Sequence, residues 1–117
     1  MPDEAVVVRG GLMQSITMNR SARIHHARHP GEWAISVACA PDRTAADLAR
    51  EATFIENLQI RTSTVGAIRA LGHDVRATGR PPHADLVLRT IPSEPLFAAL
   101  RDVFDEAEPN PRFFDDE

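Results

Sequence analysis

Five polar side chains suited to phosphate chemistry lie in one short stretch of the chain. Arg76 and Thr78 end a predicted strand, Arg80 lies in the connection, and His83 and Asp85 begin the next strand. An imidazole titrates near neutral pH and can transfer protons, while a guanidinium can stabilise an anionic transition state. These residue types predict a site in which His83 is the acid or base, Asp85 orients its ring, and Arg76 or Arg80 contacts phosphate.

The four-residue connection at 79–82 fixes how the two strands align. Pairing Thr78 with His83 places Arg76 opposite Asp85 and all four of these side chains on one face. The other face is then wholly apolar and consists of Val75, Ala77, Ala84 and Leu86. The same pattern also fits an ordinary solvated face with a weak Arg76–Asp85 ion pair, so two interpretations stay open.

All the fixed positive charge of this chain, apart from its N-terminus, is carried by arginine. Residues 5 to 101 contain twelve Arg against eight Asp or Glu, and the chain has no Lys. Arginine binds phosphate and carboxylate in a forked geometry, although genomic base composition explains all-Arg usage equally well. We expect a basic body that binds RNA or another phosphate-bearing ligand, and an acidic C-terminal end that competes for the same site.

Another group of candidates is the His-rich segment near residue 25. His25 and His29 are four residues apart in a predicted helix and could share a metal, but Arg23 and Arg28 would repel a cation. We therefore expect no metal and no cofactor. The segment is better interpreted as an exposed helix face that contacts a partner or lines an RNA groove.

Length and composition limit the class of protein. A chain of 117 residues suits one domain with one core, and no apolar run approaches the ~20 residues of a membrane span. The acidic N-terminus does not resemble a signal peptide, and the single Cys39 excludes an internal disulfide. These features predict a cytoplasmic protein with no membrane partner.

Glycine, proline and helix-capping residues divide the chain into nine elements. Strands are predicted at 5–9, 33–39, 58–62, 74–78 and 83–91, and helices at 13–29, 44–56, 63–72 and from 93 toward 108. The order β-α-β-α-β-α-β-β-α predicts an α/β (α+β) fold with a single mixed sheet of about five strands covered by helices. We place one domain at 1–108 and an acidic C-terminal tail at 109–117.

Part of this pattern matches a family of toxins. The run from Ile68 to Val75 (IRALGHDV) is followed by Thr78-Gly79, then by His83, a strand and a helix. In this order, residues 65–104 resemble the HicA-type mRNA interferase toxins, in which a helix ends at Gly and a catalytic His opens a later strand. The resemblance implies a bacterial toxin-like ribonuclease with His83 as the catalytic residue and an antitoxin as a protein partner.

A second pair of motifs points to a different enzyme. Val8-Arg9-Gly10-Gly11 ends the first predicted strand, and Arg61-Thr62-Ser63-Thr64 follows a later one. Both are similar to the arginine and Ser-Thr-Ser motifs of ADP-ribosyltransferases. That resemblance implies that Arg9 holds the phosphates of NAD and that Ser63 and Thr64 support its pocket. Ser63 or Thr64 can equally be a helix cap.

Three functions follow from the sequence and stay open at this point. The first is metal-independent cleavage of RNA by His83, with phosphate contacts from Arg9, Arg61, Arg76 and Arg80. The second is ADP-ribosyl transfer from NAD. The third is a non-catalytic module in which exposed Arg and His side chains bind a protein partner or regulator.

Overall fold

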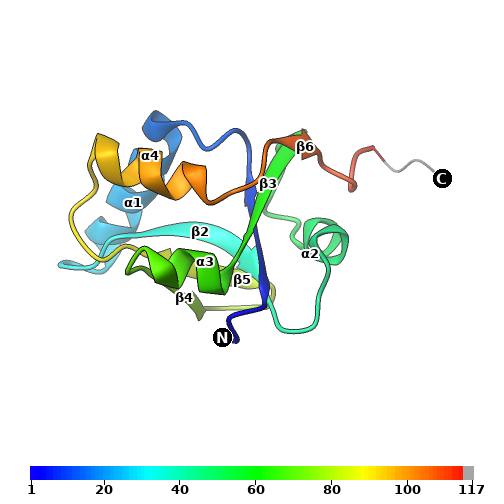
Figure 1. Cartoon of the computed structure of the whole chain (residues 1–117), viewed down its shortest axis with the longest axis horizontal. Coiled ribbons are helices and arrows are strands. Elements are labelled where there is room, and N and C mark those ends of the chain that lie inside the picture. Colours follow the sequence, from blue (N-terminus) through cyan, green and yellow to red (C-terminus); the bar gives the residue numbers. More distant parts are fainter. Residues whose placement is uncertain (115–117) are drawn as a thin grey trace.

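The computed structural model describes residues 1–114, which form an α+β fold with one antiparallel sheet (Figure 1). The strands are β1 (Val6–Gly10), β2 (Ala34–Cys39), β3 (Gln59–Thr64), β4 (Asp74–Ala77), β5 (His83–Val87) and β6 (Glu108–Pro109). The helices are α1 (Ser15–Arg28), α2 (Ala45–Glu51), α3 (Val65–Ala70) and α4 (Glu94–Asp102). The predicted single sheet covered by helices is confirmed. Its pairings are antiparallel where a mixed sheet was expected, and β6 adds a short sixth strand.

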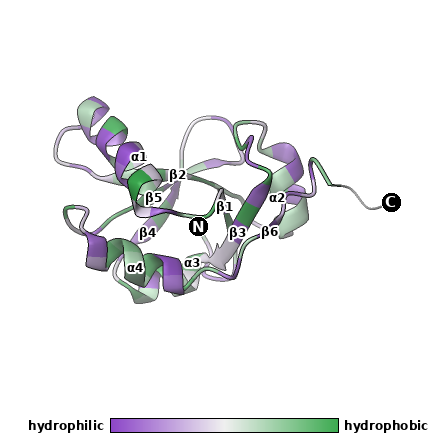
Figure 2. Ribbon diagram, turned by 90° about the horizontal axis from the view of Figure 1, so that it is seen from above, coloured by the Kyte–Doolittle hydropathy of each residue, from purple (hydrophilic) through white to green (hydrophobic). Residues whose placement is uncertain are grey.

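The sheet has the order β4-β5-β2-β1-β3-β6, and its two faces are covered unequally. Helices α1, α3 and α4 contribute buried residues to the larger core, whereas α2 packs on the opposite face over β1 and β2. Figures 1 and 2 both show α2 toward the end of the molecule opposite to α1 and α4. On the side of β5 away from the larger core, α1 contributes His25, whose Nδ1 lies 3.9 Å from Asp85 Oδ2.

The sheet opens between β1 and β2, and this opening shapes the surface above it. The two strands pair only at Val7–Cys39 and Val8–Ala38, after which β1 continues along β3 and β2 continues along β5. Ser36 of β2 pairs with Asp85 of β5, but on its other side, where β1 has turned away, its backbone has no strand beside it. Instead, the Ser36 carbonyl accepts a hydrogen bond from Arg9 Nη1 (2.7 Å), and its N–H donates to Ser21 Oγ of α1 (3.3 Å). Side chains thus satisfy the backbone groups that a neighbouring strand would otherwise pair.

The predicted register of the β4–β5 hairpin is confirmed. Arg76 pairs with Asp85, and beyond the end of β4 the N–H of Thr78 donates to the carbonyl of His83 (3.2 Å). Val75, Ala84 and Leu86 lie in the larger core as expected. Ala77 differs, because it is exposed at the open end of this edge strand.

Two element boundaries differ from the prediction in ways that matter for the site. Helix α2 ends at Glu51, so residues 52–58 form a loop that carries Phe54 and Asn57 beside the opening of the sheet. Strand β3 extends to Thr64, whose side chain caps α3 by accepting a hydrogen bond from Ala67 N (3.2 Å).

The segment predicted as an acidic tail contacts the body of the protein as far as it is described. Asn110 is fully buried and donates to the carbonyl of Asn57 (3.0 Å), and Arg112 donates to two carbonyls of the loop after α2. Asp115, Asp116 and Glu117 lie outside the described residues. Among helices within 1–114, none is sufficiently long and apolar for a membrane span.

Candidate functional site

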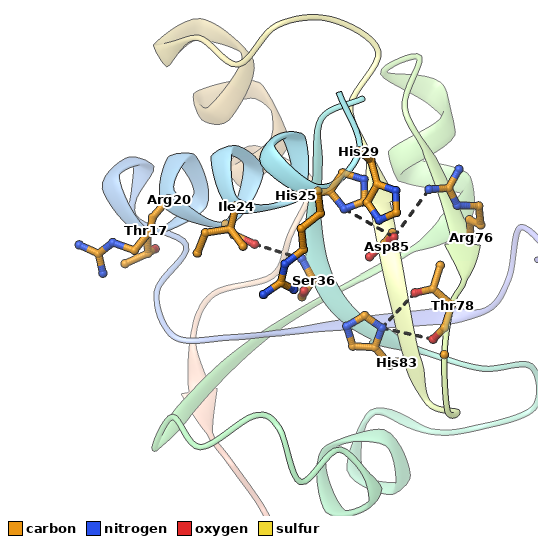
Figure 3. Close-up of a pocket in the computed structure, with 13 residues that line it drawn as sticks. Thr17, Arg20, Ile24, His25, His29, Ser36, Arg76, Thr78, His83 and Asp85 are labelled. Carbon is orange, nitrogen blue, oxygen red and sulfur yellow. Dashed lines mark hydrogen bonds and ion pairs between the residues drawn. The ribbon is translucent and has the colours of Figure 1, made fainter. Parts of the chain in front are cut away.

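A hollow of about 590 Å³, which we call the main groove, lies between α1 and the β4–β5 hairpin (Figure 3). Its ionisable lining residues are Arg20, Arg28, Arg76, His25, His29, His83 and Asp85. One carboxylate therefore faces three guanidiniums and three imidazoles among the described lining residues. Such a lining favours an anionic ligand.

His83 is held in the main groove through one of its two ring nitrogens. Its Nδ1 lies 3.0 Å from Thr78 Oγ1 and 3.3 Å from the Thr78 carbonyl oxygen, as the dashed lines in Figure 3 show. A carbonyl can only accept, so its contact favours a proton on Nδ1 and leaves Nε2 with a lone pair. The ring of Phe54 contacts the imidazole edge-on, with the ring centroids 5.0 Å apart. Thr78 and Phe54 together fix the orientation of this imidazole.

Asp85 does not have the orienting role that the sequence suggested. Its side chain is buried, and Oδ2 lies 3.7 Å from Arg76 Nη2 and 3.9 Å from His25 Nδ1. His83, in contrast, makes its described hydrogen bonds to Thr78. His83 and Asp85 are alternate residues on one face of β5, and such residues lie roughly 6.5 Å apart along a strand. Thr78, across the hairpin, is therefore closer to the imidazole of His83 than Asp85 is.

Arg76 is occupied by a carboxylate that the sequence did not bring forward. Its two terminal nitrogens donate to the two oxygens of Glu32 at 3.0 and 2.5 Å, and Glu32 Oε2 lies 2.6 Å from His25 Nε2. Hydrogen bonds from Arg76 and His25 lower the pKa of Glu32 to about 2. We call Glu32, Arg76, His25 and Asp85 the ion cluster. Glu32 of the ion cluster occupies both terminal nitrogens of Arg76. This arginine therefore forms a wall of the main groove and is not available as a phosphate ligand.

The free cations of the main groove are on α1. Arg20 and Arg28 line it, and no described residue pairs with either of them. Arg80, predicted to bind phosphate, is exposed in the hairpin loop and does not line the groove. A sequence signal for Arg20 and Arg28 exists, since they share helical spacing with Thr17 and Ile24, but it does not show which face of α1 meets the core.

A smaller groove of about 380 Å³ adjoins the main groove and shares Thr17 and Ser36 with it. Its wall includes Arg9, whose Nη1 donates to Ser36 and whose buried Nε has no described partner. Burial lowers the pKa of Arg9 to about 10, so the guanidinium stays charged at neutral pH. No carboxylate among residues 1–114 forms an ion pair with it. The smaller groove therefore contains an uncompensated positive charge.

Arg61, predicted to contact phosphate, instead supports the end of α4. Its guanidinium donates to the carbonyls of Leu12, Arg101, Phe104 and Asp105 at 2.8 to 3.3 Å. The last carbonyls of a helix have no partner within the helix, and a nearby cation satisfies them. This requirement explains the position of Arg61 without any ligand.

Ser63 and Thr64 also make structural contacts. Ser63 Oγ donates to the carbonyl of Val103 (2.7 Å), and Thr64 caps α3. Neither residue lines the groove that contains Arg9. The slot for NAD that the ADP-ribosyltransferase resemblance implied is thus not assembled from Arg9 and Ser63.

The His-rich segment contributes imidazoles rather than a metal cluster. His25 and His29 stack with their centroids 4.7 Å apart, and both line the main groove. Within residues 1–114 no three His, Cys, Asp or Glu side chains are grouped so that they could hold a metal ion.

Comparison with known proteins gives no relative from which function can be carried over. No family model, curated protein or solved structure matches the chain. The resemblances to HicA-type toxins and to ADP-ribosyltransferases therefore stay predictions. Function has to be argued from the two grooves themselves.

Proposed function

We propose that this protein is a toxin-like ribonuclease that cleaves RNA without a metal, with His83 of the main groove as the acid–base group. One observation carries the proposal. Thr78 holds Nδ1 of His83, so that Nε2 is left unbonded in a groove that also contains the unpaired Arg20 and Arg28. A fixed imidazole and guanidiniums that line the same groove are the groups that phosphodiester cleavage needs.

The chemistry follows from the nucleophile that RNA itself provides. Nε2 of His83 takes the proton of a ribose 2′-hydroxyl, whose oxygen then forms a bond to the adjacent phosphorus. The bond from phosphorus to the 5′-oxygen of the next nucleotide breaks, and that oxygen receives a proton. The products are a 2′,3′-cyclic phosphate and a free 5′-hydroxyl. No oxidant, reductant or cofactor is required.

Two further groups of the main groove suit the remaining roles. Arg20 and Arg28 neutralise the charge that grows on the non-bridging phosphate oxygens. His29 is exposed and is not bound to a carboxylate, so we assign it the proton that the leaving oxygen receives. His25 is unsuited to this role because its Nε2 is engaged by Glu32.

Expression in bacteria followed by analysis of total RNA tests the proposal. Wild type should slow growth and degrade RNA, whereas His83→Ala should do neither. His26→Ala is a matched control, because His26 stacks on Trp33 outside the main groove and should behave as wild type. Intact RNA and equal growth with wild type and His83→Ala, at equal soluble expression, would overturn the proposal.

A non-catalytic binding role is the second candidate, and exposed apolar side chains favour it. Ile16 and Ile91 are 67 % and 68 % exposed, and Phe113 and Phe114 are 43 % and 49 % exposed. Large exposed apolar side chains are common in surfaces that bind another protein. For this candidate, Ile16→Ser should abolish capture of an antitoxin-like or regulatory partner, while His83→Ala should leave capture intact.

A further inference from the structure

We propose that the smaller groove beside Arg9 is a nucleobase subsite, so that the protein takes a nucleotide whose phosphate lies in the main groove. The inference rests on the proposed function only in placing the phosphate. The ligand is then a nucleotide, and Phe54, Asn57 and Arg9 are the residues that contact its base.

The two grooves adjoin at the opening between β1 and β2. Thr17 and Ser36 line both of them, and Ser36 is the residue whose backbone is bonded by Arg9 and Ser21. A ligand with two linked parts that spans Thr17 and Ser36 therefore places one part in each groove. A nucleotide, with its planar base and its phosphate, is such a ligand.

Phe54 connects the candidate base to the candidate catalytic group. Its ring lines the smaller groove, is 43 % exposed, and contacts the imidazole of His83 at 63°. A base stacked on the free face of Phe54 lies next to His83. Stacking on an aromatic side chain accepts any base and is the usual device for holding single-stranded nucleic acid.

Asn57 offers the groups that can distinguish one base from another. A Cβ built on Gly10 would lie 2.3 Å from Asn57 Oδ1, so the carboxamide lies directly on the bare backbone of Gly10 and Gly11. Its position is fixed because the Asn57 carbonyl accepts from the buried Asn110, and no described residue bonds its side-chain amide. A carboxamide presents a donor and an acceptor side by side, which matches the edge of a base.

Arg9 sets the charge preference of this subsite. Its guanidinium is paired only with the Ser36 carbonyl among the described residues, and the lining of the smaller groove contains no acidic residue. A cationic ligand is therefore disfavoured. The carbonyl oxygens and ring nitrogens of a nucleobase are electron-rich groups that suit such a wall.

Titration with three kinds of probe tests the subsite separately from catalysis. The probes are inorganic phosphate, ribose 5-phosphate and the four 3′-nucleoside monophosphates, with binding followed by calorimetry. We expect the nucleotides to bind roughly 5- to 100-fold more tightly than ribose 5-phosphate, the usual gain from one stacked base. On the Phe54→Ala variant the nucleotides should bind no more tightly than ribose 5-phosphate does on that same variant, and Asn57→Ala should reduce the differences between bases.

Matched controls separate the two hypotheses. Phe114→Ala removes a similarly exposed ring outside both grooves and should keep the gain. If phosphate and ribose 5-phosphate bind but the base adds nothing, the subsite is wrong and the proposed function stands. If no probe binds wild type, the phosphate site of the proposed function fails. If Phe54→Ala keeps the full gain, the base does not lie on Phe54 and the inference is overturned.

Discussion

The imidazole of His83 differs from its neighbours in how its nitrogens are used. His25 is held by Glu32 at Nε2 and lies near Asp85 at Nδ1, so it belongs to the ion cluster. The buried His73 accepts a hydrogen bond from the backbone of Arg89, and burial lowers its pKa. His83 has one nitrogen fixed and the other open to the main groove. A general base requires this combination of positioning and access.

At the same scale, Glu32 predicts an acid-sensitive contribution to stability. Hydrogen bonds from Arg76 and His25 lower its pKa from 4.5 to about 2. A lowered pKa stabilises the folded state above pH 4.5, and this contribution is lost as the pH falls toward 2. Chemical denaturation across this window should show a steeper loss of the free energy of unfolding for wild type than for Glu32→Gln. Glu56→Gln, an exposed control, should follow wild type; identical pH dependence in all three proteins would contradict the role of the ion cluster.

At the scale of elements, α1 determines which residues meet in the main groove. One side of the helix buries Met18 and Ala22, while Ile16 and Ile24 stay exposed. Figure 2 shows hydrophilic and hydrophobic residues side by side along its length. Its poor apolar periodicity reflects a helix that packs at the opening of the sheet, with one side in the core and another over a groove.

Local signals were enough to predict the hairpin and the helix starts. The polar and apolar alternation of β4 and β5 fixed their register, and capping residues marked α3 and α4. The opening between β1 and β2 was not predictable, because it depends on which distant strands each of them pairs with. The same holds for Glu32, which meets Arg76 from 44 residues away in the chain. Candidate residues within one hairpin were therefore found, whereas Arg20, Arg28 and Phe54 required the fold.

Arg61 gives a prediction that belongs to the elements it joins. Removal of its guanidinium in Arg61→Gln takes a donor from the carbonyls of Phe104 and Asp105, just after α4, and from that of Leu12, which should cost about 1.5–3 kcal/mol in the free energy of unfolding. Denaturant unfolding measures this loss. Arg80→Gln, which removes an exposed arginine whose side chain has no partner among residues 1–114, should change stability by less than about 0.5 kcal/mol. Equal stabilities of the two variants would show that Arg61 does not support α4.

At the scale of the whole molecule, charge is distributed unevenly over a chain with a net charge of −4. Nine of the seventeen acidic residues lie before residue 5 or after residue 101, while the main groove contains one carboxylate among its described lining residues. Net charge alone would argue against an RNA ligand. The local charge of the two grooves argues for one, because a ligand responds to the field at its own site.

This local charge predicts a modest salt dependence of binding. Each phosphate contact with single-stranded nucleic acid contributes a slope of about 0.7 in log affinity against log salt, so Arg20 and Arg28 together predict about 1.4. A 2′-O-methyl oligonucleotide, which resists cleavage, allows this measurement. Arg20→Gln or Arg28→Gln should lower the slope by about 0.7, and Arg80→Gln should leave it unchanged. Equal slopes in all variants would place the phosphate elsewhere.

The central claim, that His83 drives cleavage at a ribose, is tested most directly with a DNA oligonucleotide containing a single ribonucleotide. Purified wild type should cut it only after that ribonucleotide and leave a 2′,3′-cyclic phosphate detectable by mass spectrometry. Purified His83→Ala should lose at least about 100-fold in rate, while His26→Ala should retain wild-type rate. Cleavage of the all-DNA oligonucleotide, or equal rates for wild type and His83→Ala, would contradict the account.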